Sequence, residues 1–138
     1  MKKIALSLLS LLLIFSLTAC FGTEPTGEWG TVSYSEDTTV GKGAKTAVVE
    51  IVTEEKTITI TLKTDEDILG AALLAEKIIA GEDGAYGLYV KEVNGVVADY
   101  DVDHTYWGFY IDGEYAMTGV DSTPIEEGKI YRLSKEKG

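Results

Sequence analysis

The sequence predicts an α+β domain in which one helix packs on a small mixed or antiparallel sheet. Three patterns lead to this fold class: strand-like alternation over residues 47–62, helical periodicity over residues 65–80, and short strands joined by glycine-containing turns over residues 86–133. Strands that both precede and follow a single helix favour an α+β arrangement. The predicted folded unit, residues 46–135, is one small domain with a modest core.

Two strands are predicted before the helix. Residues 47–53 are rich in β-branched side chains, and residues 57–62 alternate strictly between threonine and apolar side chains. Because only the polar residues 54–56 separate the two runs, we expect them to form an antiparallel hairpin. The apolar side chains of the second strand then face the core, and its threonines face solvent.

The helix is predicted over residues 65–80. Thr64 is a suitable N-cap, and the acidic residues 65–67 interact favourably with the positive end of a helix. Apolar residues then recur at spacings of three and four: Ile68, Leu69, Ala72, Leu73, Ala75 and Ile79. Gly81 is expected to end the helix in a left-handed conformation, and residues 82–84 continue as a turn.

Several strands and tight turns follow the helix. Asn94-Gly95 and Asp112-Gly113 are strong signals for two-residue hairpin turns. The predicted strands are residues 86–93, 96–98, 106–111, 114–117 and 130–133, with a turn segment at 124–129. Together with the helix, this order of elements is close to a β-grasp.

The first residues are predicted to be a lipoprotein signal peptide, residues 1–19. Two lysines precede an apolar run, and the small Ala19 stands directly before Cys20, the only cysteine in the chain. The run is short for a bilayer span of about 20 residues, and a cysteine without a partner forms no intramolecular disulfide. We therefore expect acylation of Cys20, which anchors the protein to the extracellular face of the cell membrane. A plain secretory signal is the alternative.

The chain is strongly acidic, with a formal net charge of −11. Such a charge disfavours nucleic acid, whose binding depends on lysine and arginine. Residues 20–45 are rich in Gly, Thr, Ser and Glu without apolar periodicity, which predicts a flexible tether behind the lipidated cysteine. Trp29 and Tyr34 within it either dock on the domain as an extra edge strand or are exposed.

Residues 106–114 and the later turn at 127–129 resemble the transcobalamin-like C-terminal domain family, which is a domain of unknown function in bacterial surface lipoproteins. The shared features are an aromatic strand containing Trp107, a tight turn directly after it, and a glycine-bearing turn before the last strand. Asp112 stands where the family usually has Asn, and Glu127-Gly128-Lys129 stands where it usually has Gly-Asp. The resemblance covers about residues 46–134 and implies a β-grasp-like binding scaffold. In transcobalamin the related domain closes over a corrinoid together with a helical domain not recognised here, so cobalamin binding does not transfer by itself.

The aromatic strand is the candidate binding surface. Alternation places Trp107, Phe109 and Ile111 on one face, which we expect to be the core face. The opposite face then carries tyrosines around a flat gap at a glycine, where a planar ligand or a peptide can stack. The predicted ligand-binding residues are Tyr106, Trp107, Gly108, Tyr110 and Tyr115. The alternative is that these tyrosines only pack as cross-strand pairs.

No metal site, cofactor or catalytic arrangement is predicted. Asp99, Asp101 and Asp103 share one side of an extended strand, but calcium needs more oxygens from a loop that wraps back. We expect a solvated loop there. His104 has no second histidine or cysteine to form a zinc site, and no activated nucleophile is recognisable.

The favoured hypothesis is a tethered extracellular lipoprotein with a small ligand- or partner-binding domain, whose ligand is related to corrinoids or other tetrapyrroles. The alternative is an accessory subunit that docks on a membrane transporter or a larger surface assembly. A weak hydrolase ranks last.

Overall fold

The computed structural model describes residues 27–138, so the predicted leader and Cys20 lie outside the described residues. Nine strands in this range form two sheets. The strands are β1 (Thr38–Gly41), β2 (Lys45–Val52), β3 (Thr57–Thr64), β4 (Ile79–Gly84), β5 (Gly87–Val93), β6 (Val96–Val97), β7 (Thr105–Ile111), β8 (Glu114–Tyr115) and β9 (Ile130–Lys137). The helical elements are η2 (Gly27–Thr31), α1 (Leu69–Ala75), α2 (Tyr100–Asp103) and η3 (Val120–Ser122).

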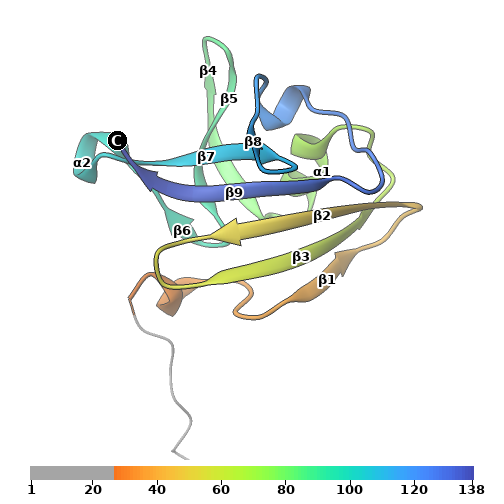
Figure 1. The fold of residues 1–138 in the computed structure, drawn as a ribbon, viewed down its shortest axis with the longest axis horizontal. Coiled ribbons are helices and arrows are strands. Elements are labelled where there is room, and N and C mark those ends of the chain that lie inside the picture. The colour runs from red at the N-terminus through yellow and green to blue at the C-terminus, as the bar shows by residue number, and fades with distance from the viewer. Residues whose placement is uncertain (1–26) are drawn as a thin grey trace, which may run out of the picture.

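The larger sheet has six strands in the order β1-β3-β2-β9-β7-β8. β2 and β3 form the predicted antiparallel hairpin, β9 lies parallel to β2, and β7 runs antiparallel to β9. Figure 1 shows this twisted sheet running across the molecule, with β7 and β8 at its upper edge.

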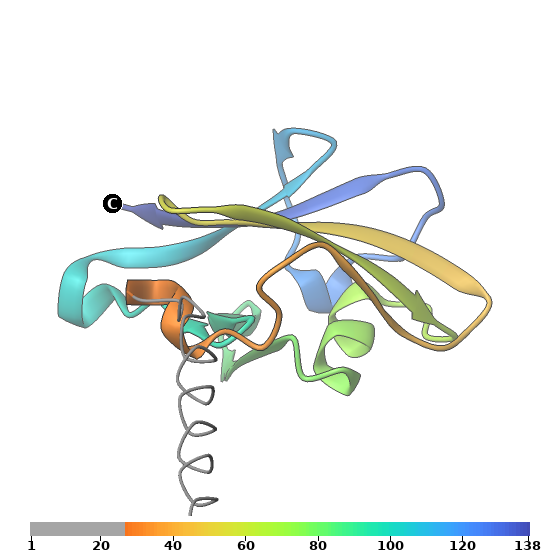
Figure 2. The same ribbon diagram turned by 90° about the horizontal axis from the view of Figure 1, so that it is seen from below.

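One face of the six-stranded sheet carries the core. Figure 2 shows α1, η2 and the three-stranded sheet β4-β5-β6 on the same side of it. The apolar side chains predicted on β3 point into this layer, since Ile58, Ile60 and Leu62 are all buried. Threonines occupy the opposite face of β3, as alternation predicts.

The predicted fold class is wrong. Instead of one helix on a small sheet, the regular structure of the described residues is mostly β, and the larger sheet alone has six strands. The smaller sheet takes much of the core surface that the prediction gave to the helix, because Ile79, Val93 and Val96 are buried there. No helix among residues 27–138 has the length and apolar character needed to cross a membrane.

The helix is shorter than the predicted range of residues 65–80. α1 ends at Ala75, and Lys77 takes a left-handed conformation with φ of 59°. The chain then enters β4, where a turn was expected. Gly81 does not end the helix but lies in this strand, where a Cβ atom would stand 2.0 Å from the carbonyl oxygen of Tyr89. Glycine therefore permits the close approach of β4 and β5.

The tether prediction is wrong for residues 27–45. Trp29 is buried, and its indole Nε1–H donates to Thr53 Oγ1 at 2.8 Å. β1 pairs in parallel with β3 and adds an edge strand to the larger sheet. Tyr34 packs against the core, so both aromatic residues dock on the domain.

Both predicted hairpin turns are confirmed. Asn94 and Gly95 have φ of 54° and 85°, and Asp112 and Gly113 have φ of 51° and 86°. Positive φ angles at both central residues are typical of a type I′ turn, whose backbone twist matches the right-handed twist of the flanking strands. The strand that follows Gly113 is shorter than predicted, since β8 contains only two residues.

Candidate functional site

The inward face of β7 is the one that the sequence predicts. Trp107 and Phe109 are buried, with 8% and 9% of their surface exposed, and Ile111 packs against the core. Trp107 donates its indole N–H to the carbonyl of Val96 at 3.2 Å. This bond satisfies the polar end of the ring and links β7 of the larger sheet to β6 of the smaller one.

The outward face of β7 is organised by a carboxylate from β9. The hydroxyl groups of Tyr106 and Tyr110 both donate to Glu136, at 3.2 Å and 2.6 Å. A Cβ atom on Gly108 would stand 3.0 Å from Glu136 Oε1, so this carboxylate lies over the glycine. The flat gap expected between the two tyrosines is therefore occupied by Glu136.

Tyr110 is further enclosed by its neighbours on the same face. Tyr115, its partner in the β7–β8 register, meets it edge-on with ring centroids 5.5 Å apart. Arg132 lies 5.9 Å from the ring centroid and also bonds Glu50 at 3.1 Å. The hydrogen bond to Glu136 raises the pKa of Tyr110 to about 12, because the carboxylate favours the neutral phenol. Tyr110 and Tyr115 thus pack as a cross-strand pair on this face.

A groove of about 250 Å³ lies between β5 and β7. We name it the β5–β7 groove; its lining residues are Leu88, Tyr89, Val90, Tyr106, Trp107, Phe109, Tyr115, Gly119, Val120 and Leu133. Of the predicted ligand-binding residues, Tyr106, Trp107 and Tyr115 line it, and Gly108 and Tyr110 do not. The groove is mostly apolar, and Tyr89 and Tyr115 are its most exposed aromatic residues.

Two local features shape the groove. β8 pairs only with Tyr110 and Ile111, so the remainder of β7 forms an edge of the larger sheet. On the other wall, the carboxylate of Asp121 accepts the backbone N–H of Leu88 at 3.0 Å and holds η3 against β5. Sequence patterns missed the contributions of β5 and η3, because alternation within a strand does not show which other strand lies beside it.

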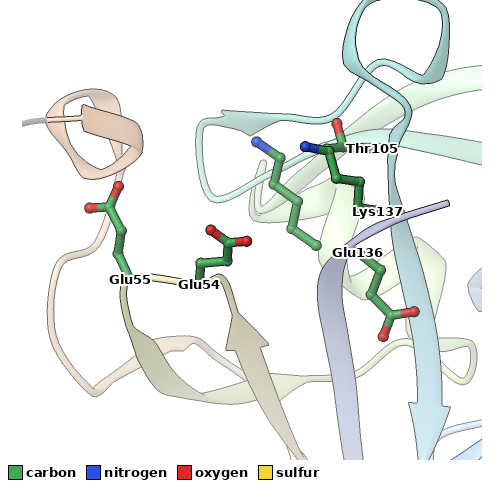
Figure 3. Close-up of a pocket in the computed structure, with 6 residues that line it drawn as sticks. Glu54, Glu55, Thr105, Glu136 and Lys137 are labelled. Carbon is green, nitrogen blue, oxygen red and sulfur yellow. The ribbon is translucent and has the colours of Figure 1, made fainter.

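A second, charged pocket of about 280 Å³ lies where β9 ends. Its lining residues are Glu54, Glu55, Thr105, Lys135, Glu136 and Lys137. Figure 3 shows Glu54 and Glu55 on one side, Lys137 near Thr105 on the other, and the Glu136 carboxylate turned away. The hydrogen bond from Thr105 lowers the pKa of Asp103, and Lys135 and Lys137 add to this effect. Carboxylates and lysines thus both line this pocket.

The aspartates near His104 do not lie on an extended strand; where a solvated loop was expected, the chain forms the short exposed helix α2. Asp101 and Asp103 belong to α2, and Asp99 is its N-cap, whose side chain accepts the N–H of Asp101 at 3.0 Å. Asp103 accepts the N–H of Thr105 at 3.1 Å, and the ring of His104 lies 5.0 Å from that of Tyr100. Within residues 27–138, no three or more His, Cys, Asp or Glu side chains are grouped so that they could hold a metal ion.

Comparisons with known proteins concern the segment that builds the groove. Residues 63–130 match the family described as Domain of unknown function (DUF4430). No curated protein matches the chain.

Two solved structures are similar to the chain. One is a proposed metal-binding protein from Ruminococcus gnavus ATCC 29149, with 29% identity and a TM-score of 0.64 over 69% of this chain and 99% of that one. The other is haptocorrin in complex with Cbi, with 20% identity and a TM-score of 0.48 over 67% of this chain and 25% of that one. The Ruminococcus protein therefore consists almost wholly of the fold described here.

Proposed function

We propose that the protein is a lipoprotein anchored to the extracellular face of the cell membrane, and that its domain binds a partner or ligand through the β5–β7 groove. The observation that carries the proposal is the groove itself. It is concave and mostly apolar, and it is bordered by the exposed rings of Tyr89 and Tyr115. Aromatic side chains with one exposed edge are common at binding surfaces because they give large contact area for little lost entropy.

The size of the groove limits what it can hold. Its volume of about 250 Å³ is below the range of about 300–1,000 Å³ that is typical of pockets for drug-sized ligands. It therefore takes a single ring or one or two side chains. A corrinoid or other tetrapyrrole is far larger, so it would place only one edge in the groove and would need a second surface from another protein.

The position of the groove suits a tethered protein. Cys20 lies seven positions before Gly27, a distance that an extended chain spans in at most about 25 Å. Figure 1 shows η2, the first described element, at the lower side of the molecule, while β8 and the tip of β4 and β5 lie at the top. With an anchor at Cys20, this arrangement favours a groove that faces away from the membrane.

The proposal is tested by binding measurements on three variants. Tyr89→Ala and Tyr115→Ala remove rings that line the groove, and Tyr86→Ala is the matched control, because Tyr86 is fully exposed and does not line it. The probe is the apolar dye bis-ANS, and calorimetry with cobinamide, haemin and Ca²⁺ extends the test to the ligand classes that the resemblance and the Ruminococcus protein suggest.

We expect the two groove variants to weaken dye binding about tenfold, as for lost aromatic contacts at a binding surface, and the control to bind as the parent does. Equal binding by all four proteins would contradict the assignment of the groove. Co-purification of the native protein with a permease would favour the alternative function as an accessory subunit of a transporter.

A further inference from the structure

We infer that the β5–β7 groove receives an extended peptide segment of a partner protein, and that this segment pairs with the open edge of β7 as an added strand. The inference rests on the proposed function of the groove and names the class of its ligand.

The open edge follows from the hydrogen-bond pattern of β7. Two backbone hydrogen bonds lie one residue pair beyond the ends of the β7–β9 ladder. At one end the N–H of Asp112 donates to the carbonyl of Ile130 at 2.8 Å, and at the other the N–H of Gly138 donates to the carbonyl of His104 at 2.9 Å. In an antiparallel pair, the backbone groups of alternate residues point to opposite sides. The even-numbered residues of β7 therefore bond to β9, and the odd-numbered residues point away from it.

The odd-numbered residues have a partner only at one end. Ile111 pairs with β8, and the carbonyl of Phe109 accepts the N–H of Ala116 at 3.0 Å. Beyond this bond, the N–H of Phe109 and both backbone groups of Trp107 point away from β9 and have no backbone partner among the described residues. Both residues line the groove. A run of such groups is a template for another strand, and domains that bind peptides by strand addition use this arrangement.

The lining of the groove suits the side chains of an added strand. Alternate side chains of a strand point to one face, so every second residue of the peptide would enter the groove. There they meet Leu88, Val90 and Val120. A volume of about 250 Å³ accommodates one or two branched aliphatic side chains, so apolar residues at alternate positions fit best.

Charge favours a peptide with basic flanks. No lysine, arginine, aspartate or glutamate lines the groove. Two carboxylates border it through its lining residues: Asp121 accepts the N–H of Leu88, and Glu136 accepts the hydroxyl of Tyr106. Since the whole chain carries a net charge of −11, lysine or arginine at the ends of the segment would be attracted to this face.

The test uses one designed peptide and two methylated forms of it. The parent peptide has the sequence Lys-Val-Thr-Val-Thr-Val-Lys with blocked ends. In one form the valine nitrogens are methylated, and in the other the threonine nitrogens. The N–H groups of valines and threonines point to opposite edges of an extended strand, so each form blocks one edge and leaves the side chains unchanged.

We expect the parent peptide to bind the protein, one methylated form to bind at least about tenfold more weakly, and the other to bind within about twofold of the parent, since only one edge can pair with β7. In hydrogen exchange followed by NMR, the bound peptide should slow the amides of Trp107 and Phe109 and leave that of Tyr110, already paired with β9, unchanged. Equal binding of all three peptides, equal weakening by both methylated forms, or no binding of the parent would overturn the inference.

The bis-ANS measurement separates this inference from the proposed function. If the dye binds and depends on Tyr89 and Tyr115 while the peptides fail, the groove remains a binding site for another ligand class. If the dye also binds independently of these residues, the proposed function of the groove fails as well.

Discussion

At the scale of single residues, Glu136 decides what the outer face of β7 offers. Alternation predicts correctly that Trp107 faces the core and that Tyr106 and Tyr110 face outward. It does not predict that a carboxylate from β9 accepts hydrogen bonds from both tyrosines. That contact depends on the pairing of β7 with β9, which joins segments far apart in the sequence. The face of a residue can therefore be predicted from local pattern, but its partner across the sheet cannot.

The bond between Tyr110 and Glu136 predicts a distinct alkaline titration. The pKa of Tyr110 is about 12 in the folded protein against an ordinary value of 10.0. Between these values the phenol ionises in the unfolded chain but not in the folded one, so the stability from this bond is complete below pH 10 and is lost as the pH rises through 12. In an absorbance titration of tyrosinate, Tyr110→Phe should remove an ionisation step near pH 12.

Tyr86→Phe is the control for this titration, because Tyr86 is fully exposed. It should leave the step near pH 12 in place. A late step that survives in Tyr110→Phe would show that the hydrogen bond does not raise the pKa of Tyr110.

Asn94 is a residue with two separate structural roles. It is fully buried and has a left-handed backbone, which the Asn-Gly turn signal predicts. Its side chain also accepts the N–H of Tyr34 at 2.9 Å and donates to the carbonyl of Tyr34 at 2.8 Å. This second role ties the N-terminal segment to the smaller sheet, and no local pattern reveals it.

Substitutions at Asn94 should separate the two roles. Asn94→Gly keeps the backbone conformation but leaves the polar groups of Tyr34 unpaired, which should lower the free energy of unfolding by about 1–3 kcal/mol. Asn94→Ala adds the cost of a left-handed alanine, about 1 kcal/mol more. Urea denaturation of both variants measures these losses. Equal stability of the glycine variant and the parent protein would show that the bond to Tyr34 contributes nothing.

At the scale of elements, the helix shows why the end of an element is harder to predict than its existence. The apolar spacing correctly places Leu69, Ala72 and Leu73 on one buried face. At the start, Thr64 still belongs to β3, and Ile68 forms a β-bridge with Pro124, so the chain is extended there. At the end, Ile78 and Ile79 fit the helical spacing but pack in the core just before and within β4. The apolar spacing at this end fits a helix or a strand, and pairing with β5 in the tertiary structure decides for the strand.

The segment before β2 shows that average composition does not predict every ordered element. Its composition is typical of a tether, yet it contributes η2 and β1. Two contacts hold it in place: Trp29 inserts beneath the turn that carries Thr53, and β1 completes the edge of the larger sheet. A few anchoring side chains can order a polar segment, which average composition does not register.

Removal of the Trp29 ring should therefore destabilise the whole domain. Trp29 is 4% exposed, and Trp→Ala changes in a core cost about 3–5 kcal/mol. We expect a loss of this size for Trp29→Ala in urea denaturation, and a smaller loss for Trp29→Phe, which keeps an aromatic ring but not the bond to Thr53. If Trp29→Ala unfolds at the same urea concentration as the parent protein, the segment is only loosely attached.

At the scale of the whole molecule, the groove exists because two sheets meet unevenly. β8 covers only part of the edge of β7, and β5 crosses beside the uncovered part (Figure 1). The sequence predicts most of the strands and both hairpin turns, but it does not predict that they separate into two sheets. The site can be predicted only as far as the aromatic strand, because its other wall comes from the arrangement of the sheets.

The proposed anchor is a property of the whole molecule, since it sets where the domain works. Cys20→Ser removes the thiol that accepts the lipid. We expect the variant to leave the membrane fraction and the native protein to carry a mass increase from acylation at its first residue after the leader is cleaved.

Ser10→Ala, a small change within the apolar part of the leader, is the control and should leave the protein membrane-bound. Thermal midpoints of the released variant and of the purified lipoprotein should agree, because the described strands of both sheets lie within residues 38–137, away from Cys20 in the sequence. A native protein that keeps an unmodified thiol, or a Cys20→Ser variant that stays in the membrane fraction, would show that another feature of the chain determines its location.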